Sequence, residues 1–87
     1  MRKIWSDEGW DDYEYWQSQD KKSLKKINRL LKSIERNGYK CEGHPEKLTG
    51  DLNGFYSAHI DEKNRIVFRI TEDGLEIIQC GSHYRDK

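Results

Sequence analysis

Four residues that are distant in the sequence carry side chains that together can cleave RNA. They are Glu46, Arg65 and the adjacent pair His83 and Tyr84. A carboxylate can take the proton of a ribose 2′-OH, which then attacks the neighbouring phosphate, while an imidazole protonates the departing 5′ oxygen. A guanidinium can stabilise the charge that develops on the phosphate, and a tyrosine can stack on a base. The set predicts Glu46 as the base, His83 as the acid and Arg65 as the phosphate-binding cation, in a reaction without a metal.

Each of these residues also has an ordinary structural interpretation. Glu46 can be a solvated loop carboxylate, Arg65 can form an ion pair across a sheet, and His83 and Tyr84 can be terminal residues without a role. Any small domain contains such residue types, so their spacing alone leaves both interpretations open.

Two cysteines and two histidines offer a second kind of site. Cys41 and His44 form one C-x-x-H pair, and Cys80 and His83 form another. Two Cys and two His suit a tetrahedral zinc ion, although the usual finger pattern keeps the cysteines together and the histidines together. Cys80 also lies in an apolar run, where a cysteine usually behaves as a small buried hydrophobic residue. A small zinc-stabilised domain is therefore an alternative that competes for His83.

The composition limits the class of protein that can carry these sites. The chain has 87 residues and a formal net charge of zero, with 37% charged and 33% hydrophobic residues. An aromatic share of 11% argues against disorder, because disordered segments are poor in aromatic residues. No apolar run approaches the roughly 18 residues of a membrane helix, and no signal-peptide pattern is present. We expect one domain over residues 1–87, in the cytoplasm, with reduced cysteines.

Hydrophobic periodicity predicts two helices among four strands. The first helix follows Ser6 and covers about 7–18, and the second follows Asp20 and ends at Asn37-Gly38. Residues 39–54, which include Glu46, form a long irregular stretch. The predicted strands cover residues 3–5, 55–60, 65–71 and 75–80. The order β-α-α-β-β-β predicts an α+β fold with two helices packed on one face of an antiparallel sheet.

Alternation along the strands predicts which side chains face the helices. In residues 65–70 the apolar Ile66, Phe68 and Ile70 share one face, and the opposite face carries Arg65, Val67 and Arg69. Arg69 is therefore a second candidate for contact with phosphate. In the last strand, regular alternation puts His83 in phase with Leu75, Ile77 and Gln79, and Tyr84 in the opposite phase. Gly81-Ser82 offers a place for the chain to leave strand geometry.

One segment is strongly basic although the whole chain is neutral. Residues 20–40 hold eight basic and two acidic side chains. Such a field attracts phosphate backbones or acidic partners, and it is also what an ordinary solvated helix face looks like. If it binds RNA, the residues expected to contact the phosphates are Lys21, Lys22, Lys25, Lys26, Arg29 and Lys32.

An ordered set of residues along nearly the whole chain resembles one family, the YoeB/Txe toxins of the RelE superfamily. In the first half it comprises Ile4-Trp5-Ser6, Trp10-Asp11-Asp12-Tyr13, Tyr15-Trp16-Gln17, Asp20-Lys21 and Lys25-Lys26-Ile27-Asn28 with Leu30. In the second half it comprises Gly43, Pro45-Glu46, Leu48, Leu52, Gly54-Phe55, Ser57, Ile60, Arg65, Val67, Leu75, Ile77, Cys80 and His83-Tyr84.

The resemblance implies a ribosome-dependent mRNA endonuclease that cleaves message in the ribosomal A site and inhibits translation. It implies Glu46 as general base, Arg65 as phosphate-binding residue and His83 as general acid, with Tyr84 beside His83 in the site. It also implies a microbial-RNase-like fold with no metal or other cofactor. It also implies a YefM-like antitoxin whose disordered acidic tail folds over the active site, operator DNA as an indirect partner through that antitoxin, and a possible homodimer. Exposed aromatic residues at Trp10, Tyr13 or Trp16 are candidates for its interface, although core packing is the commoner role of such residues.

The chain departs from the family pattern at a few positions. Thr49 and His59 stand where such toxins often have further basic residues, and His59 contacts phosphate well only when protonated. Asn64 replaces a histidine that is common before the arginine, and Arg85-Asp86-Lys87 extends past the tyrosine. These departures motivate a second hypothesis, a toxin-like module that binds antitoxin or ribosome but cuts weakly or not at all.

Overall fold

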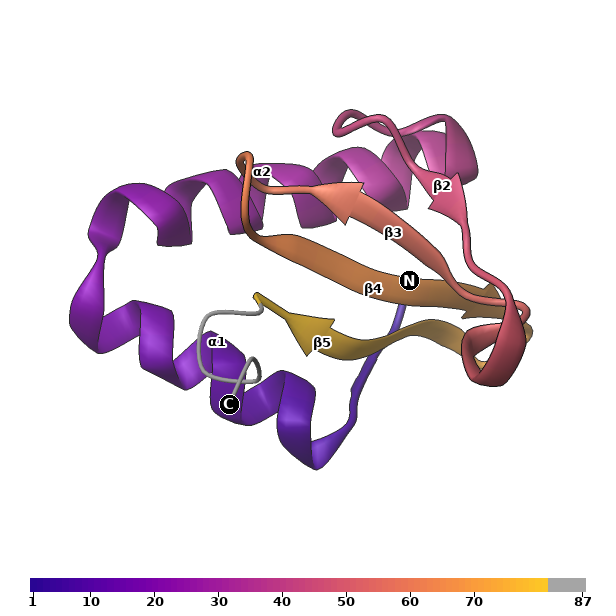
Figure 1. Ribbon diagram of the computed structural model, residues 1–87, viewed down its shortest axis with the longest axis horizontal. Coiled ribbons are helices and arrows are strands. Elements are labelled where there is room, and N and C mark those ends of the chain that lie inside the picture. The colour runs from indigo at the N-terminus through magenta and orange to yellow at the C-terminus, as the bar shows by residue number, and fades with distance from the viewer. Residues whose placement is uncertain (82–87) are drawn as a thin grey trace.

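Two helices lie against one face of a five-stranded sheet (Figure 1). The computed structural model describes residues 1–81 of the chain. Its elements are β1 (Lys3–Trp5), α1 (Asp7–Gln19), α2 (Lys21–Asn37), the 3₁₀ turn η1 (Gly38–Lys40), β2 (Glu46–Lys47), the 3₁₀ turn η2 (Gly50–Leu52), β3 (Tyr56–His59), β4 (Arg65–Thr71) and β5 (Gly74–Cys80). The predicted α+β class and the two helices on one face are confirmed. In the described part of the chain, no helix is both long and apolar enough to cross a membrane.

The helices begin where the sequence predicts. The Ser6 hydroxyl accepts a hydrogen bond from the Gly9 amide at 2.9 Å and so caps α1. Asp20 caps α2 by accepting from the amides of Lys22 and Ser23, and the hydrogen bonds from Ser23 lower the pKa of the Asp20 carboxyl. These side chains satisfy amides that have no partner inside the helix.

The sheet has the order β1-β5-β4-β3-β2 and is mixed. Strands β3, β4 and β5 form the predicted antiparallel meander, whereas β1 pairs with β5 in parallel. A parallel pair needs a long crossover connection, which both helices supply here. The sequence predicted an antiparallel sheet, and the direction of this three-residue edge strand is the detail in which the structure differs.

The core fills the space between the helices and the sheet. Ile27 and Ile34 of α2 and Phe68 of β4 are fully buried in it, together with Ile66, Leu75, Ile77, Ala58 and Cys80. We call this side of the sheet the helix face, and the opposite side the open face. Pairing across the sheet agrees with the predicted alternation in β4, because Ile66 pairs with the buried Ala58 and Cys80 of the helix face. Arg65 on the open face is exposed, although Val67 on that face is buried.

A β-bulge in β5 changes the phase of the last strand. Val67 pairs with Gln79 but Phe68 pairs with Ile77, so Ile78 is an extra residue in β5. The Ser6 hydroxyl donates a hydrogen bond to the carbonyl of this extra residue at 3.1 Å. The prediction that Gln79 shares the phase of Leu75 and Ile77 is therefore wrong: beyond the bulge, Cys80 is the buried residue.

Candidate functional site

Glu46 begins a strand instead of lying in a loop, and this fixes the face on which it stands. Glu46 pairs with Ser57, Ser57 with Val67, and Val67 with Gln79, so these four residues form one row across the sheet. Paired residues in antiparallel strands point to the same side. Glu46 therefore belongs to the open face.

Arg65 stands on the same face, one row further along. It pairs with His59, and it lies two residues from Val67 on β4. Strand spacing and rise put its Cα about 12 Å from that of Glu46. Two long side chains at this separation can reach toward opposite sides of one phosphate–ribose unit. The structure thus brings together three of the predicted residues, Glu46, His59 and Arg65.

A shallow pocket of about 230 Å³ lies on the open face around Arg65. Its walls are Leu48, Leu52, Ser57, Lys63, Arg65, Val67 and Gln79. Pockets that enclose small molecules are usually larger, about 300–1,000 Å³. An open depression of this size, bordered by two cations, suits one unit of a longer chain better than an enclosed small ligand.

Within residues 1–81, neither Glu46 nor Arg65 has an ion-pair partner. Both are exposed. The interpretation of Arg65 as a cross-strand ion pair is therefore not supported by the described part of the structure, and both charges are available to a ligand.

The turn before Arg65 is fixed by Asp61 and Asn64. The Asp61 carboxylate accepts hydrogen bonds from the amides of Lys63 and Asn64, at 2.8 and 2.7 Å, and from the Asn64 side chain. Burial opposes the charge of Asp61, but the hydrogen bonds from Asn64 and Lys63 prevail and lower its pKa. Asn64, one of the departures from the family pattern, is itself buried and has this structural role.

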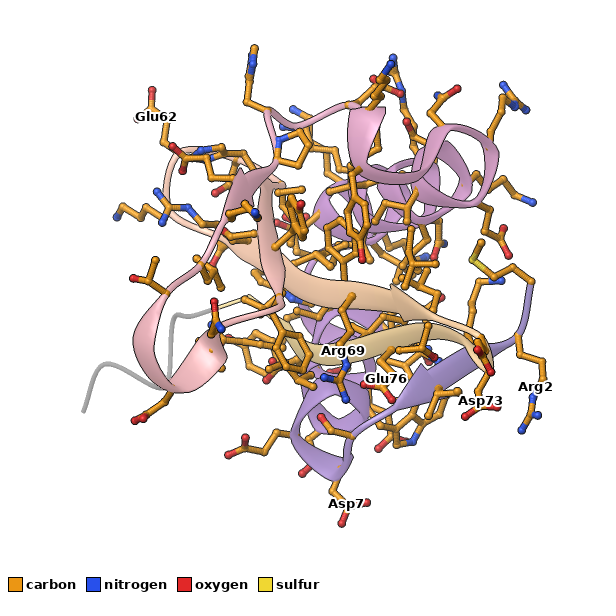
Figure 2. The ribbon with its side chains drawn as sticks, turned by 90° about the vertical axis from the view of Figure 1, so that its right-hand side faces the viewer. Arg2, Asp7, Glu62, Arg69, Asp73 and Glu76 are labelled. Carbon is orange, nitrogen blue, oxygen red and sulfur yellow. The ribbon has the colours of Figure 1, made fainter. Side chains whose placement is uncertain are left out.

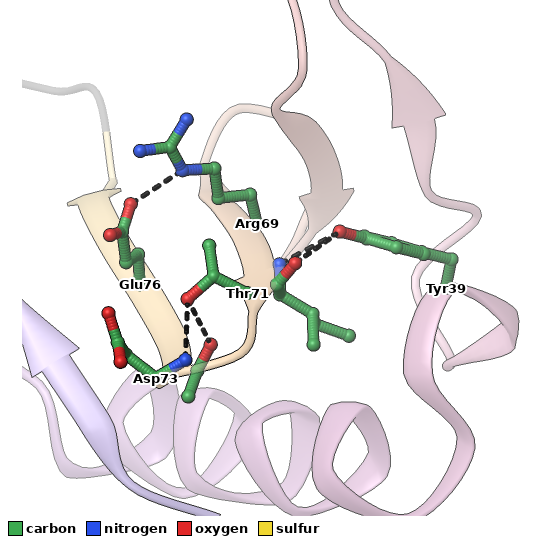
Figure 3. A network of polar contacts seen from close by, with 7 residues as sticks. Tyr39, Arg69, Thr71, Asp73 and Glu76 are labelled. Carbon is green, nitrogen blue, oxygen red and sulfur yellow. Dashed lines mark hydrogen bonds and ion pairs between the residues drawn. The ribbon is translucent and has the colours of Figure 1, made fainter.

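Arg69 shares the open face but is already engaged. Its Nε donates to Glu76 Oε1 at 2.6 Å, and its guanidinium carbon lies 4.6 Å from the centre of the Phe55 ring. Figures 2 and 3 show Arg69 and Glu76 pointing toward each other across β4 and β5. Arg69 can contact phosphate only in competition with Glu76, so its predicted role is weaker than that of Arg65.

The end of β5 lies beside Arg65. The Gly81 amide donates to the Arg65 carbonyl at 2.8 Å. His83 and Tyr84, predicted as acid and as base-stacking residue, lie outside the described residues.

The basic face of α2, defined by Lys21, Lys22, Lys25, Lys26, Arg29 and Lys32, is exposed throughout. Arg29 forms an ion pair with Glu42 at 2.9 Å. A groove of about 160 Å³ connects this face to the end of β3, because Lys26 and Arg29 line it together with His59. The cations of α2 therefore adjoin the row that carries Arg65.

The aromatic residues of α1 divide into surface and core. Trp10 is 42% exposed and Tyr13 is half-buried, and both rings contact Trp5 beside a groove of about 400 Å³. Trp16 is only 6% exposed and belongs to the core, so of the two interpretations offered for it, core packing is correct and exposure at an interface is wrong. Helical spacing does not show which turn of α1 meets the end of β5.

The cysteines of the alternative zinc site are buried thiols. Burial raises the pKa of Cys41, and burial together with the charge of Asp12 raises the pKa of Cys80 to about 12. Among residues 1–81, no three His, Cys, Asp or Glu side chains gather as a metal site would require, and the fourth predicted ligand, His83, is beyond this range.

The structure adds two residues to the open-face pocket that sequence reasoning missed. Lys63 lies in the turn before β4, where a lysine has no distinguishing pattern. Gln79 reaches the pocket only because the bulge at Ile78 shifts the phase of β5. Neither could be found from strict alternation.

Known proteins with the same architecture are bacterial toxins. Residues 5–84 match the family described as the YoeB-like toxin of bacterial type II toxin–antitoxin systems. Toxin YoeB of Escherichia coli K12 is 48% identical over 84 residues, which cover 97% of this chain and 100% of that protein.

Solved structures agree with this match. The YoeB–YefM complex from Staphylococcus aureus superposes with a TM-score of 0.89 at 41% identity, covering 97% of this chain and 98% of that one. The YoeB dimer from the same organism superposes with a TM-score of 0.87 at 42% identity and the same coverage. These matches place the chain among the toxins of bacterial toxin–antitoxin systems. Within that class, it belongs to the YoeB-like toxin family, as the sequence resemblance indicated.

Proposed function

We propose that this protein is a ribosome-dependent mRNA endonuclease that cleaves message in the ribosomal A site and so inhibits translation. The reaction is a metal-independent transfer in which a ribose 2′-OH attacks its own phosphate and releases the 5′ oxygen of the next nucleotide. Membership of the YoeB-like toxin family supports this activity, and so do the two charged residues Glu46 and Arg65 on the open face.

Glu46 is the general base and Arg65 the phosphate-binding cation in this proposal. Glu46 accepts the proton of the 2′-OH, and the Arg65 guanidinium stabilises the charge that develops on the phosphate. His83 protonates the leaving 5′ oxygen, and Tyr84 stacks on a base or binds a phosphate oxygen. Acid–base groups typically contribute about 10²–10⁴-fold, and charge stabilisation often contributes more.

One observation carries the proposal: Glu46 and Arg65 share one face of the sheet in adjacent rows, and neither has an ion-pair partner within residues 1–81. Unpaired opposite charges at this separation suit a substrate that offers a hydroxyl proton to one and a phosphate to the other. His59 extends the cationic side of the site when it is protonated, and Arg69 does so only when it leaves Glu76.

The basic face of α2 contacts ribosomal RNA in this proposal. It adjoins the site through the groove that Lys26, Arg29 and His59 share. Neutralising phosphates releases counterions, so binding should weaken steeply as salt rises. Reversing the charges of Lys21, Lys25 and Lys32 should weaken ribosome binding and flatten its salt dependence; an unchanged affinity would reject the contact.

The partners follow from the relatives. Structures of a YoeB–YefM complex and of a YoeB dimer support a YefM-like antitoxin and a homodimer for this chain. The half-exposed rings of Trp10 and Tyr13 are the interface that we propose for the dimer. Operator DNA is contacted only through the antitoxin complex, and the activity belongs in the cytoplasm, where the ribosomes are.

The decisive experiment is cleavage of a defined mRNA by purified protein, with and without ribosomes carrying an empty A site. Wild-type protein should cut at the A-site codon only when ribosomes are present, and Glu46→Gln and His83→Gln should each lose at least about 10²-fold in rate. Glu62→Gln is the matched control, because Glu62 is an exposed carboxylate in the turn beyond β3. Ribosome binding without cleavage by the wild type would establish the non-catalytic module instead, and Thr49 and His59 would be the residues to change to basic ones.

A further inference from the structure

Two side chains of α1 bind the backbone of the last residue of β5. The Asp12 carboxylate, which is 0% exposed, accepts a hydrogen bond from the Cys80 amide at 2.8 Å. The Trp16 indole N–H donates to the Cys80 carbonyl at 2.7 Å. Both backbone polar groups of Cys80 are therefore held by α1, on the side of β5 that faces away from β4.

The next residue is held as closely. The Gly81 amide donates to the Arg65 carbonyl at 2.8 Å. Gly81 has φ +124°, and a Cβ built on it would lie 2.9 Å from Trp16 Nε1. Only a glycine fits between the indole and β4 in this conformation. Gly81 is thus held from one side by Trp16 of α1 and from the other by the backbone of Arg65.

Attachment of α1 to β5 does not by itself require these contacts. Ser6 already binds the backbone of Ile77 and the carbonyl of Ile78, and Gly9 packs directly against the Ile77 carbonyl. Burying a carboxylate also costs free energy that an apolar contact would not. Asp12 and Trp16 nevertheless both bind the backbone of Cys80, which points to a role of these contacts other than helix packing.

We propose that Asp12 and Trp16 are positioning residues for the acid step: by holding Cys80, they fix the point from which the segment with His83 and Tyr84 departs. Only Gly81 and Ser82 separate Cys80 from His83. A displacement of reacting groups by about 1 Å can cost about 10²-fold in rate, so this anchor sets how well the acid meets the 5′ oxygen. The inference rests on the proposed endonuclease function.

The test uses two conservative variants that each weaken one contact. Trp16→Phe keeps an aromatic ring in the core but removes the N–H donor, and Asp12→Asn keeps the shape but removes the charge. Ser18→Ala is the control, because it removes one hydrogen bond of the same helix, from the Ser18 hydroxyl to the Tyr15 carbonyl, at an exposed position without a proposed role. Single-turnover cleavage is measured on A-site-programmed ribosomes over a range of ribosome concentrations and pH values.

We expect Trp16→Phe and Asp12→Asn to lower the maximal rate about tenfold or more at an unchanged half-saturating ribosome concentration, and to change the pH profile on its basic side, where the acid loses its proton. Ser18→Ala should cleave as the wild type does. Wild-type rates and pH profiles in both variants, or a loss that Ser18→Ala shares at equal thermal stability, would overturn the positioning role. Absence of cleavage by the wild type would instead contradict the proposed function, so the two failures are distinguishable.

Discussion

The two faces of the sheet consist of alternating residues of the same strands, yet they are covered differently. On the helix face, Ile66 and Phe68 of β4 are completely buried in the core. On the open face, Arg65 of the same strand is exposed, while Val67 is buried and Leu48 and Leu52 line the shallow pocket beside it. Most of the fully buried apolar side chains thus lie on the helix face, and the charges of Glu46 and Arg65, which have no ion-pair partner within residues 1–81, lie on the other.

This separation shows how a small domain can keep reactive charges without losing stability. A protein of this size buries little surface, so it has few apolar contacts to lose. Because the charges of Glu46 and Arg65 remain in solvent, neither needs the partner that a buried charge would require. Substitutions on the two faces should therefore affect different measurements.

The largest effect is expected on the helix face. Phe68→Ala should lower the free energy of unfolding by about 3–5 kcal/mol, because it removes a fully buried ring and leaves a cavity. Denaturant titration measures it. Arg65→Gln in the same strand should change that free energy by about 0.5 kcal/mol or less, since it alters an exposed side chain. Equal losses from both substitutions would contradict the division between the faces.

The same Arg65→Gln variant should have its effect on cleavage instead. Loss of the phosphate-binding cation should lower the cleavage rate about 10²–10³-fold, as for removal of a group that stabilises charge in a transition state. Arg65→Lys keeps the charge but not the planar pair of donors. Its cleavage rate should lie between those of the wild type and Arg65→Gln. A Gln variant that cuts at the wild-type rate would remove Arg65 from the mechanism.

A smaller effect is expected in the turn between β3 and β4. Asp61→Asn should cost about 1–2 kcal/mol at pH 7, because the carboxylate accepts several hydrogen bonds from Lys63 and Asn64. The pKa of Asp61 is lowered in the folded state, so its contribution is complete above the unfolded value of about 3.9 and is lost as pH falls through the lower folded value. Wild type and variant should therefore converge in stability toward pH 2, and a constant difference from pH 7 to pH 2 would be inconsistent with this role.

The smallest effect concerns the ion pair on the open face. A double-mutant cycle with Arg69→Ala and Glu76→Ala should give a coupling free energy of about 0.2–1 kcal/mol, because both side chains are partly exposed. Glu76→Gln, which releases Arg69, should strengthen RNA binding at low salt if Arg69 can contact phosphate. Unchanged RNA binding in Glu76→Gln would limit Arg69 to a structural role beside Phe55.

Local patterns in the sequence were sufficient for much of the fold. Ser6 and Asp20 predict the starts of α1 and α2, and alternation in residues 65–71 predicts which side of β4 is buried. These features depend on neighbours within a few positions, such as the capped amides or the period of the strand. The family was also identified from the sequence, because its pattern extends along almost the whole chain.

Other features depended on segments that are distant in the sequence. The two-residue strand β2 exists only because β3 offers an edge, so Glu46 gains its place beside Ser57 from pairing and not from any pattern of its own. The bulge at Ile78 moves Gln79 to the open face, and the pairing of Arg69 with Glu76 reduces its availability. The burial of Trp16 likewise follows from where α1 meets the end of β5.

The sequence by itself determined the types of element, the helix caps, the buried side of β4 and the family. Only the tertiary structure decided that Glu46 and Arg65 stand in adjacent rows of one open face, and that Asp12 and Trp16 of α1 hold Cys80. The physical reason is that caps and periodicity are local properties of the backbone, whereas strand register, bulges and contacts between α1 and β5 are set by the packing of the whole chain.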